Sequence, residues 1–124
     1  MNEKPVDAGL EGPPRRLLRG TRQLAYLVGK RLLVGVTYVD PDGTLLGRDQ
    51  FCGKVLEVVD GVVVVDRPGE EEPAVLPAEH TAYERAPRGT YTLTRSGESV
   101  VNPDMMTTWT VVVEELPPGV TPAQ

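Results

Sequence analysis

The chain has 124 residues, of which 40% are hydrophobic, 25% charged and 5% aromatic, and its formal net charge is −5. This length suits a single domain with one modest core. The single cysteine, Cys52, excludes an internal disulfide, and no stretch approaches the ~18 apolar residues of a membrane-spanning helix. Since the N-terminus lacks an apolar segment of signal-peptide length, we expect a cytoplasmic protein that contacts no membrane.

Charge is distributed unevenly along the chain. Residues 15–31 hold six basic residues and no acidic one, whereas residues 32–124 hold six basic and fifteen acidic residues, a net charge of −9. An acidic body disfavours nonspecific nucleic-acid binding and favours a basic partner, and the basic segment has the opposite tendency. The basic residues of that segment are Arg15, Arg16, Arg19, Arg22, Lys30 and Arg31.

Residues 1–14 are rich in proline, glycine and charge, and this composition predicts a disordered N-terminal tail. Apolar residues then recur at helical spacing, which predicts a short helix between residues 15 and 28. Thr21 is a candidate N-cap of this helix, and Gly29 fits its C-terminal stop. The apolar residues of this pattern are Leu17, Leu24, Leu27 and Val28.

Three strands are predicted next, over residues 30–39, 45–59 and 62–66. The first alternates, with Leu32, Val34, Val36 and Tyr38 facing inward. Residues 40–43 (DPDG) have turn chemistry, and Asp60-Gly61 is a hairpin signal because both residues tolerate positive φ. The second strand is long, and its glycines, Gly47 and Gly53, are positions where it can bulge or bend.

The rest of the chain alternates short strands with turns. An acidic loop at 67–73 precedes a short strand at 74–76, a helical turn within 77–86, and a hairpin that pairs 89–94 with 99–101. A last strand is expected at 105–113, and a proline-rich tail at 117–124. Short strands at this spacing predict an all-β domain over residues 15–116, and the bent second strand favours a small antiparallel barrel with a short N-terminal helix and an extra C-terminal hairpin.

Residues 24–66 resemble the opening of Sm-like proteins: a short helix ending in Gly29-Lys30, a strand, a long bent strand, a hairpin and a third strand. The resemblance implies a barrel that assembles into rings and binds RNA in a central pore. Asp49 is followed four residues later by Gly53, where the Sm RNA pocket has Asn, and no Arg-Gly signature occurs near Ala74. The strand pattern is also similar to that of Src-homology-type barrels, which bind peptides. In size and charge the chain resembles bacterial immunity proteins.

Residues suited to catalysis or metal binding are few. His80 is the only histidine and lacks an evident nucleophile, so a surface position is favoured over a general base. Cys52 lies in a predicted strand, which favours a small buried hydrophobe over a nucleophile. Asp40, Asp42 and Gly43 have the composition of a calcium loop without its spacing or its closing Glu. We therefore predict no catalytic residue, no metal and no cofactor; an enzyme would need a pocket with perturbed carboxylates.

The acidic run Glu70, Glu71 and Glu72 is the most distinctive surface feature. Such a run is usually a solvated loop or protects a sheet edge. The alternative is that it acts with Asp40 and Asp42 as a clamp for a protein with a basic surface. We therefore predict an acidic protein-binding module, such as an immunity or inhibitor protein that blocks a toxin. The competing hypothesis is an Sm-like RNA-associated module that uses the basic residues between Arg15 and Arg31. Both leave the oligomeric state open.

Overall fold

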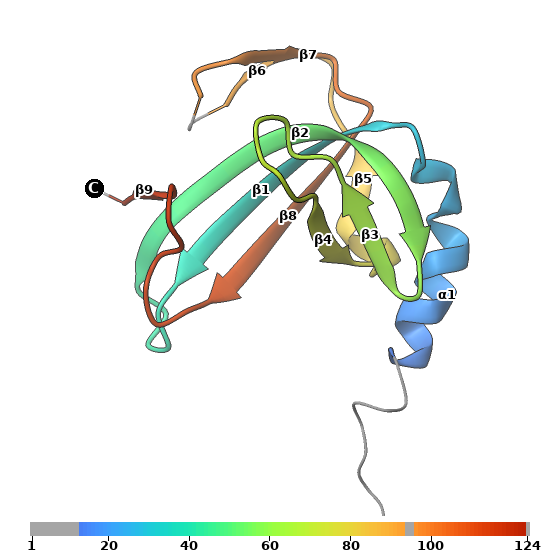
Figure 1. The fold of residues 1–124 in the computed structure, drawn as a ribbon, viewed down its shortest axis with the longest axis horizontal. Coiled ribbons are helices and arrows are strands. Elements are labelled where there is room, and N and C mark those ends of the chain that lie inside the picture. The colour runs from blue at the N-terminus through green and yellow to red at the C-terminus, as the bar shows by residue number, and fades with distance from the viewer. Residues whose placement is uncertain (1–12, 94–95, 124) are drawn as a thin grey trace, which may run out of the picture.

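The computed structural model describes residues 13–93 and 96–123, and shows one short helix beside a bent sheet (Figure 1). The predicted tail at 1–14 lies outside these residues except for Pro13 and Pro14. The elements in chain order are α1 (Arg15–Gln23), the 3₁₀ turn η3 (Ala25–Leu27), β1 (Arg31–Val39), β2 (Leu45–Val59), β3 (Val62–Val65), β4 (Ala74–Pro77), the 3₁₀ turn η4 (His80–Ala82), β5 (Tyr83–Arg85), β6 (Thr90–Thr92), β7 (Ser99–Val101), β8 (Met105–Val112) and β9 (Thr121–Pro122). The prediction of a β-rich chain with a short N-terminal helix is confirmed.

Seven strands form one mixed sheet in the order β4-β3-β2-β1-β8-β5, with β9 added beside β2. The pair β1–β8 is parallel, with Leu32 opposite Met105, whereas the sequence analysis predicts antiparallel pairing throughout. The sheet is not closed into a barrel, because its two end strands, β4 and β5, are not paired with each other. A side chain links them instead: the Tyr83 hydroxyl of β5 donates to the Pro77 carbonyl of β4 at 2.7 Å.

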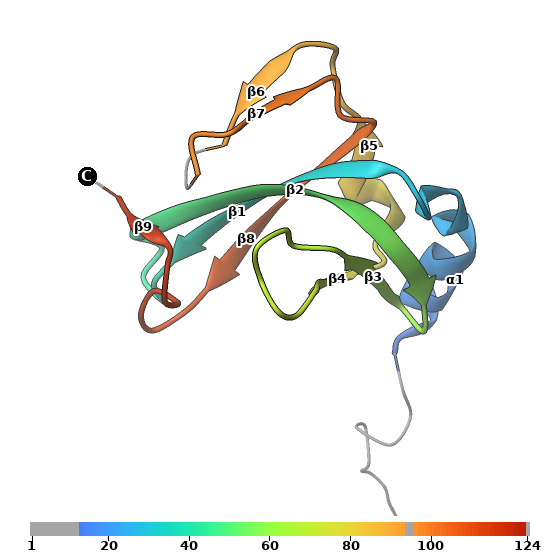
Figure 2. The same cartoon turned by 45° about the horizontal axis from the view of Figure 1, so that its top comes forward.

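Strand β2 occupies the predicted range and bends along its length (Figure 2). Its first part pairs with β1 as far as Lys54, and its second part pairs with β3 from Val55 onward. Gly53 lies where the chain changes partner, and a Cβ there would come within 1.7 Å of the Asp66 carbonyl oxygen. The register irregularities of β2 lie beside Gly47, between its partners Tyr38 and Val39, and between Val55 and Glu57. At Gly53 the absent side chain leaves room for the segment that follows β3.

The main core lies under the inner face of β1, β2 and β3. Leu32 and Val34 of β1 are fully buried there, as the alternation predicts. Other fully buried side chains come from the helical segment and from β2 and β3: Leu24, Leu27, Val55, Val63 and Val65. A second, smaller cluster on the other face of β1 joins Leu33 to Leu93 and Val100, because the separate hairpin β6–β7 covers the start of β1 (Figure 2).

The helical segment differs from its prediction. Helix α1 ends at Gln23, and a 3₁₀ turn rather than further α-helix leads to Gly29, which has φ +87° and ends the segment as predicted. Thr21 is not the N-cap. It lies inside α1, where its hydroxyl donates to the Leu17 carbonyl at 2.9 Å and accepts the Gly61 N–H at 2.7 Å. Thr21 therefore ties the helix to the β2–β3 turn.

The C-terminal segment also contacts the sheet. Residues 117–124 read as a tail in the sequence, yet β9 pairs with β2 opposite Gly47 and Arg48, and Val120 is buried. The predicted hairpin of β6 and β7 is confirmed, but β8 turns away from it to pair with β1 and β5. Strand β8 therefore belongs to the main sheet rather than to an added hairpin.

Candidate functional site

The acidic loop at 67–73 is anchored at its start and exposed at its centre. The Arg67 guanidinium stacks 4.5 Å from the centre of the Phe51 ring and lies 3.1 Å from an Asp49 carboxylate oxygen. Asp49 itself is only 4% exposed, so this ion pair is partly removed from water. Glu70, Glu71 and Glu72 follow on the exposed part of the loop. The loop therefore displays three carboxylates from a fixed base.

Asp40 and Asp42 lie together in the β1–β2 turn. One Asp40 carboxylate oxygen accepts the N–H groups of Asp42 and Thr44, both at 2.9 Å, so this side chain shapes the turn. The turn lies at the opposite end of β2 from Lys54, whose carbonyl accepts the N–H of Asp66 just before the acidic loop. The loop then runs back along β2, where Glu70 lines a hollow with Gln50 and Phe51, roughly 15–20 Å along the strand from Leu45 at ~3.3 Å per residue. The structure does not bring the two acidic groups together.

The six basic residues predicted as a nucleic-acid surface divide into three groups. Arg15, Arg19 and Arg22 are exposed and, at positions i, i+4 and i+7, share one face of α1. Arg16 points elsewhere and pairs with Glu79 at 2.9 Å. The remaining two, Lys30 and Arg31, lie between the helix and β1.

Arg31 is engaged in structure rather than free for a partner. Its guanidinium donates to the carbonyls of Val101 and Asn102 at 3.0 and 3.3 Å, and its backbone N–H donates to the Asp104 carboxylate at 2.8 Å. Arg31 therefore fastens the β7–β8 turn to the start of β1.

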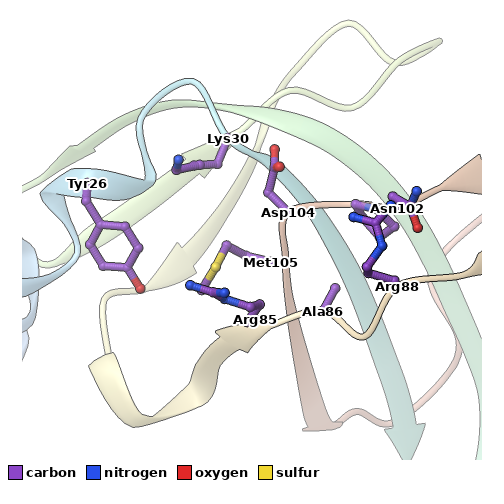
Figure 3. Close-up of a pocket in the computed structure, with 9 residues that line it drawn as sticks. Tyr26, Lys30, Arg85, Ala86, Arg88, Asn102, Asp104 and Met105 are labelled. Carbon is purple, nitrogen blue, oxygen red and sulfur yellow. The ribbon is translucent and has the colours of Figure 1, made fainter.

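Lys30 lines a hollow of about 480 Å³ that sequence analysis does not reveal (Figure 3). Tyr26 and Lys30 approach it from the connection between α1 and β1, and Arg85 approaches from β5 (Figure 3). The other lining residues come from the segments around β5 and the β7–β8 turn: Ala86, Arg88, Asn102, Pro103, Asp104 and Met105. No local sequence motif marks Arg85 and Arg88 as site residues. Only the pairing of β5 with β8 brings them near Lys30.

The two residues considered for catalysis lie apart from this hollow. His80 is half-exposed, and its Nδ1 lies 4.0 Å from the carboxylate of its neighbour Glu79. Burial raises the pKa of the Cys52 thiol, the charge of Arg31 opposes this shift, and the acidic side chains of Asp104 and Glu98 add to it with smaller effects. A raised pKa lowers the thiolate fraction, which makes Cys52 a poor nucleophile.

The described part of the chain contains no group of three or more histidine, cysteine, aspartate or glutamate side chains arranged to hold a metal ion. Within the same residues, no helix has the length and apolar character needed to cross a membrane. Met105 lies in the main core, and Trp109 packs against it.

The chain matches no family model, no curated protein and no solved structure. The function must therefore be argued from its own surfaces, which are the acidic loop, the basic face of α1 and the hollow beside it.

Proposed function

We propose that the chain is a non-catalytic binding module whose acidic loop engages the basic surface of a protein partner. The observation that carries this proposal is the loop itself, which exposes Glu70, Glu71 and Glu72 beyond an Arg67 side chain fixed by Asp49 and Phe51. Fixing the base of a binding loop lowers the entropy that is lost on association. A partner with clustered Lys and Arg would be attracted to this loop, and an inhibitor or immunity protein that blocks a basic toxin fits this description.

Complementary charge acts mainly on the rate of association. An exposed acidic loop raises the on-rate for a basic partner, and the effect weakens as salt shortens the screening length to ~8 Å at physiological ionic strength. The net charge of −9 over residues 32–124 adds a long-range contribution of the same sign.

The test is a pull-down from host lysate with the full chain as bait, with and without nuclease. In the test variant, Glu70, Glu71 and Glu72 are replaced by Lys. The charge-matched control replaces three other exposed residues, Glu84, Glu114 and Glu115, by Lys. We expect one stoichiometric protein partner that survives nuclease, is retained by the control and is lost by the test variant. Equal recovery of that partner by both variants would contradict the acidic-loop proposal.

A second candidate, RNA association, is favoured by the face of α1 that carries Arg15, Arg19 and Arg22. No described residue lies within ion-pair distance of these three guanidinium groups. In the same pull-down this candidate requires nuclease-sensitive recovery that falls steeply with salt, and replacing the three arginines by Gln should abolish it. A ring-sized native mass of the bait would support an Sm-like assembly, whereas a monomer would count against it.

The relationship to Sm-like or Src-homology-type barrels remains part of this proposal. The helix ahead of β1 and the bent β2 support it. The parallel pair β1–β8 and the open side between β4 and β5 are departures from such a barrel.

A further inference from the structure

We propose that the hollow lined by Tyr26, Lys30, Arg85 and Arg88 binds a nucleoside phosphate. The proposal is independent of the acidic loop, and it shares only Lys30 with the basic residues predicted from the sequence.

The first argument is charge. Three of the nine lining residues are cationic (Lys30, Arg85 and Arg88), and only Asp104 is acidic. None of the three cations forms an ion pair with a described residue, although the chain as a whole is acidic. Like charges around one hollow repel one another, and an anion with more than one negative charge relieves that repulsion. Arginine side chains suit phosphate in particular, because the planar guanidinium donates two parallel hydrogen bonds to phosphate oxygens.

The second argument is that the wall of the hollow is fixed before any ligand arrives. Asn102 and Gly89 exchange two hydrogen bonds, each of 2.8 Å, one through the backbone and one through the Asn102 side chain. This pair holds the segment carrying Arg88 against the β7–β8 turn. Arg31 fastens the same turn to β1 through its bonds to Val101 and Asn102. A preformed site loses less entropy on binding than a mobile one.

Asn102 lies in the β7–β8 turn with φ +48°, in the left-handed region that asparagine adopts more readily than most residues other than glycine. Its contacts to Gly89 and Arg31 hold it in this position.

The third argument selects a nucleoside phosphate over phosphate alone. A volume of about 480 Å³ falls within the ~300–1,000 Å³ typical of small-molecule sites. Tyr26, a residue that is 53% exposed, contributes an aromatic ring, and Met105 contributes a mostly buried apolar wall. An exposed aromatic ring beside cationic groups provides a stacking surface for a base next to donors for its phosphate. Figure 3 shows Tyr26 on the same side of the hollow as Lys30 and facing the side chain of Arg85.

Calorimetric titration of the full chain with AMP, ADP, adenosine and inorganic phosphate tests this proposal. We expect ADP and AMP to bind, and adenosine and inorganic phosphate each to bind at least about tenfold more weakly, since each lacks one half of the recognised group. Arg85→Gln and Arg88→Gln should each weaken AMP binding by about tenfold to a hundredfold. Tyr26→Ala should weaken AMP binding and leave the response to inorganic phosphate unchanged.

The matched control is Arg48→Gln, which removes an exposed arginine from β2 outside the lining of the hollow. It should leave AMP binding unchanged. A 5′-phosphorylated single-stranded oligonucleotide, titrated in parallel, distinguishes the source of the ligand. Binding of free nucleotide indicates a small-molecule site, and binding of the strand alone, lost in Arg88→Gln, indicates a site for a strand end. The proposal is overturned if neither binds, if inorganic phosphate binds as well as AMP, or if Arg48→Gln is as damaging as Arg88→Gln.

Discussion

Tyr83 combines packing, a hydrogen bond and burial at a single residue. Its ring meets Trp109 edge-on, with centroids 6.1 Å apart and planes at 66°, an arrangement favoured by the quadrupoles of the two rings. Its hydroxyl donates to the Pro77 carbonyl, and burial raises the pKa of that hydroxyl above its ordinary value. The neutral form of Tyr83 is therefore the one that the folded state requires.

This pKa shift predicts a loss of stability at high pH. A tyrosine in the unfolded chain ionises near pH 10, whereas Tyr83 in the folded chain keeps its proton to higher pH. Above about pH 10 the unfolded state binds fewer protons, so stability falls by up to ~1.4 kcal/mol per pH unit, and below that pH this contribution is constant. Tyr83→Phe should remove this pH dependence from unfolding free energies measured at pH 8 and pH 11. Tyr26→Phe, at an exposed position, should keep it, and an unchanged slope in Tyr83→Phe would contradict the assignment.

At the scale of elements, the bend of β2 determines how the sheet covers the core. It allows one strand to pair with β1 in its first part and with β3 in its second. Glycine is required at position 53, where β2 changes partner, because the Asp66 carbonyl occupies the space of a side chain there.

Gly53→Ala should therefore destabilise the protein by about 3 kcal/mol or more, since either β2 or the segment after β3 must move. Gly35→Ala is the matched control in the neighbouring strand β1, where the nearest atom to the added Cβ is a Thr108 methyl carbon at an ordinary 3.5 Å. We expect it to change stability by less than about 1 kcal/mol. Denaturant unfolding of both variants provides the measurement. Similar unfolding midpoints for the two variants would contradict this prediction and show that the backbone near Asp66 can move at little cost in free energy.

Local patterns were sufficient for most elements, but not for how they pair. Alternation identifies β1, the Asp60-Gly61 signal identifies the β2–β3 turn, where both residues have positive φ, and Gly47 lies beside a register irregularity of β2. The parallel direction of β8 relative to β1 differs from the prediction, because an alternating strand carries no information about which partner it has or in which direction it runs. Thr21, predicted as an N-cap, lies near the C-terminal end of α1 and accepts the Gly61 N–H from 40 residues away, a contact that no local pattern indicates.

The same distinction applies to the candidate site. The acidic run and the arginines of α1 are visible as runs and spacings, and the structure leaves Glu71, Arg15 and Arg19 exposed. The hollow was not predictable, because Tyr26, Arg85 and Asn102 come from separate segments that only tertiary pairing assembles.

At the scale of the whole molecule, the sheet has a well-supported centre and two weakly supported ends. Strand β1 is paired on both sides, by β2 and by β8, and it carries fully buried residues of the main core. The end strands β4 and β5 have four and three residues, and each pairs on one side only. The Tyr83–Pro77 hydrogen bond joins these ends through a single side chain.

Native-state hydrogen exchange should therefore be slowest in β1 and fastest in β4 and β5. Amide hydrogens of a central strand exchange with solvent only when much of the fold opens, whereas those of short end strands exchange through local opening at low free-energy cost. Mass spectrometry or NMR on the full chain measures the order directly. Protection in β4 equal to that in β1 would indicate that the sheet behaves as a closed structure in solution.

The parallel pairing of β1 with β8 also has a consequence during synthesis. Arg31 and Asp104, which join the starts of these two strands, lie 73 residues apart. At the ~5–20 residues per second of a translating ribosome, β1 leaves the exit tunnel roughly 4–15 s before its partner. Throughout that interval an apolar strand has an unpaired edge, and such a strand is a substrate for chaperones and for misassociation between nascent chains. The centre of the finished sheet thus stays incomplete until most of the chain has been synthesised.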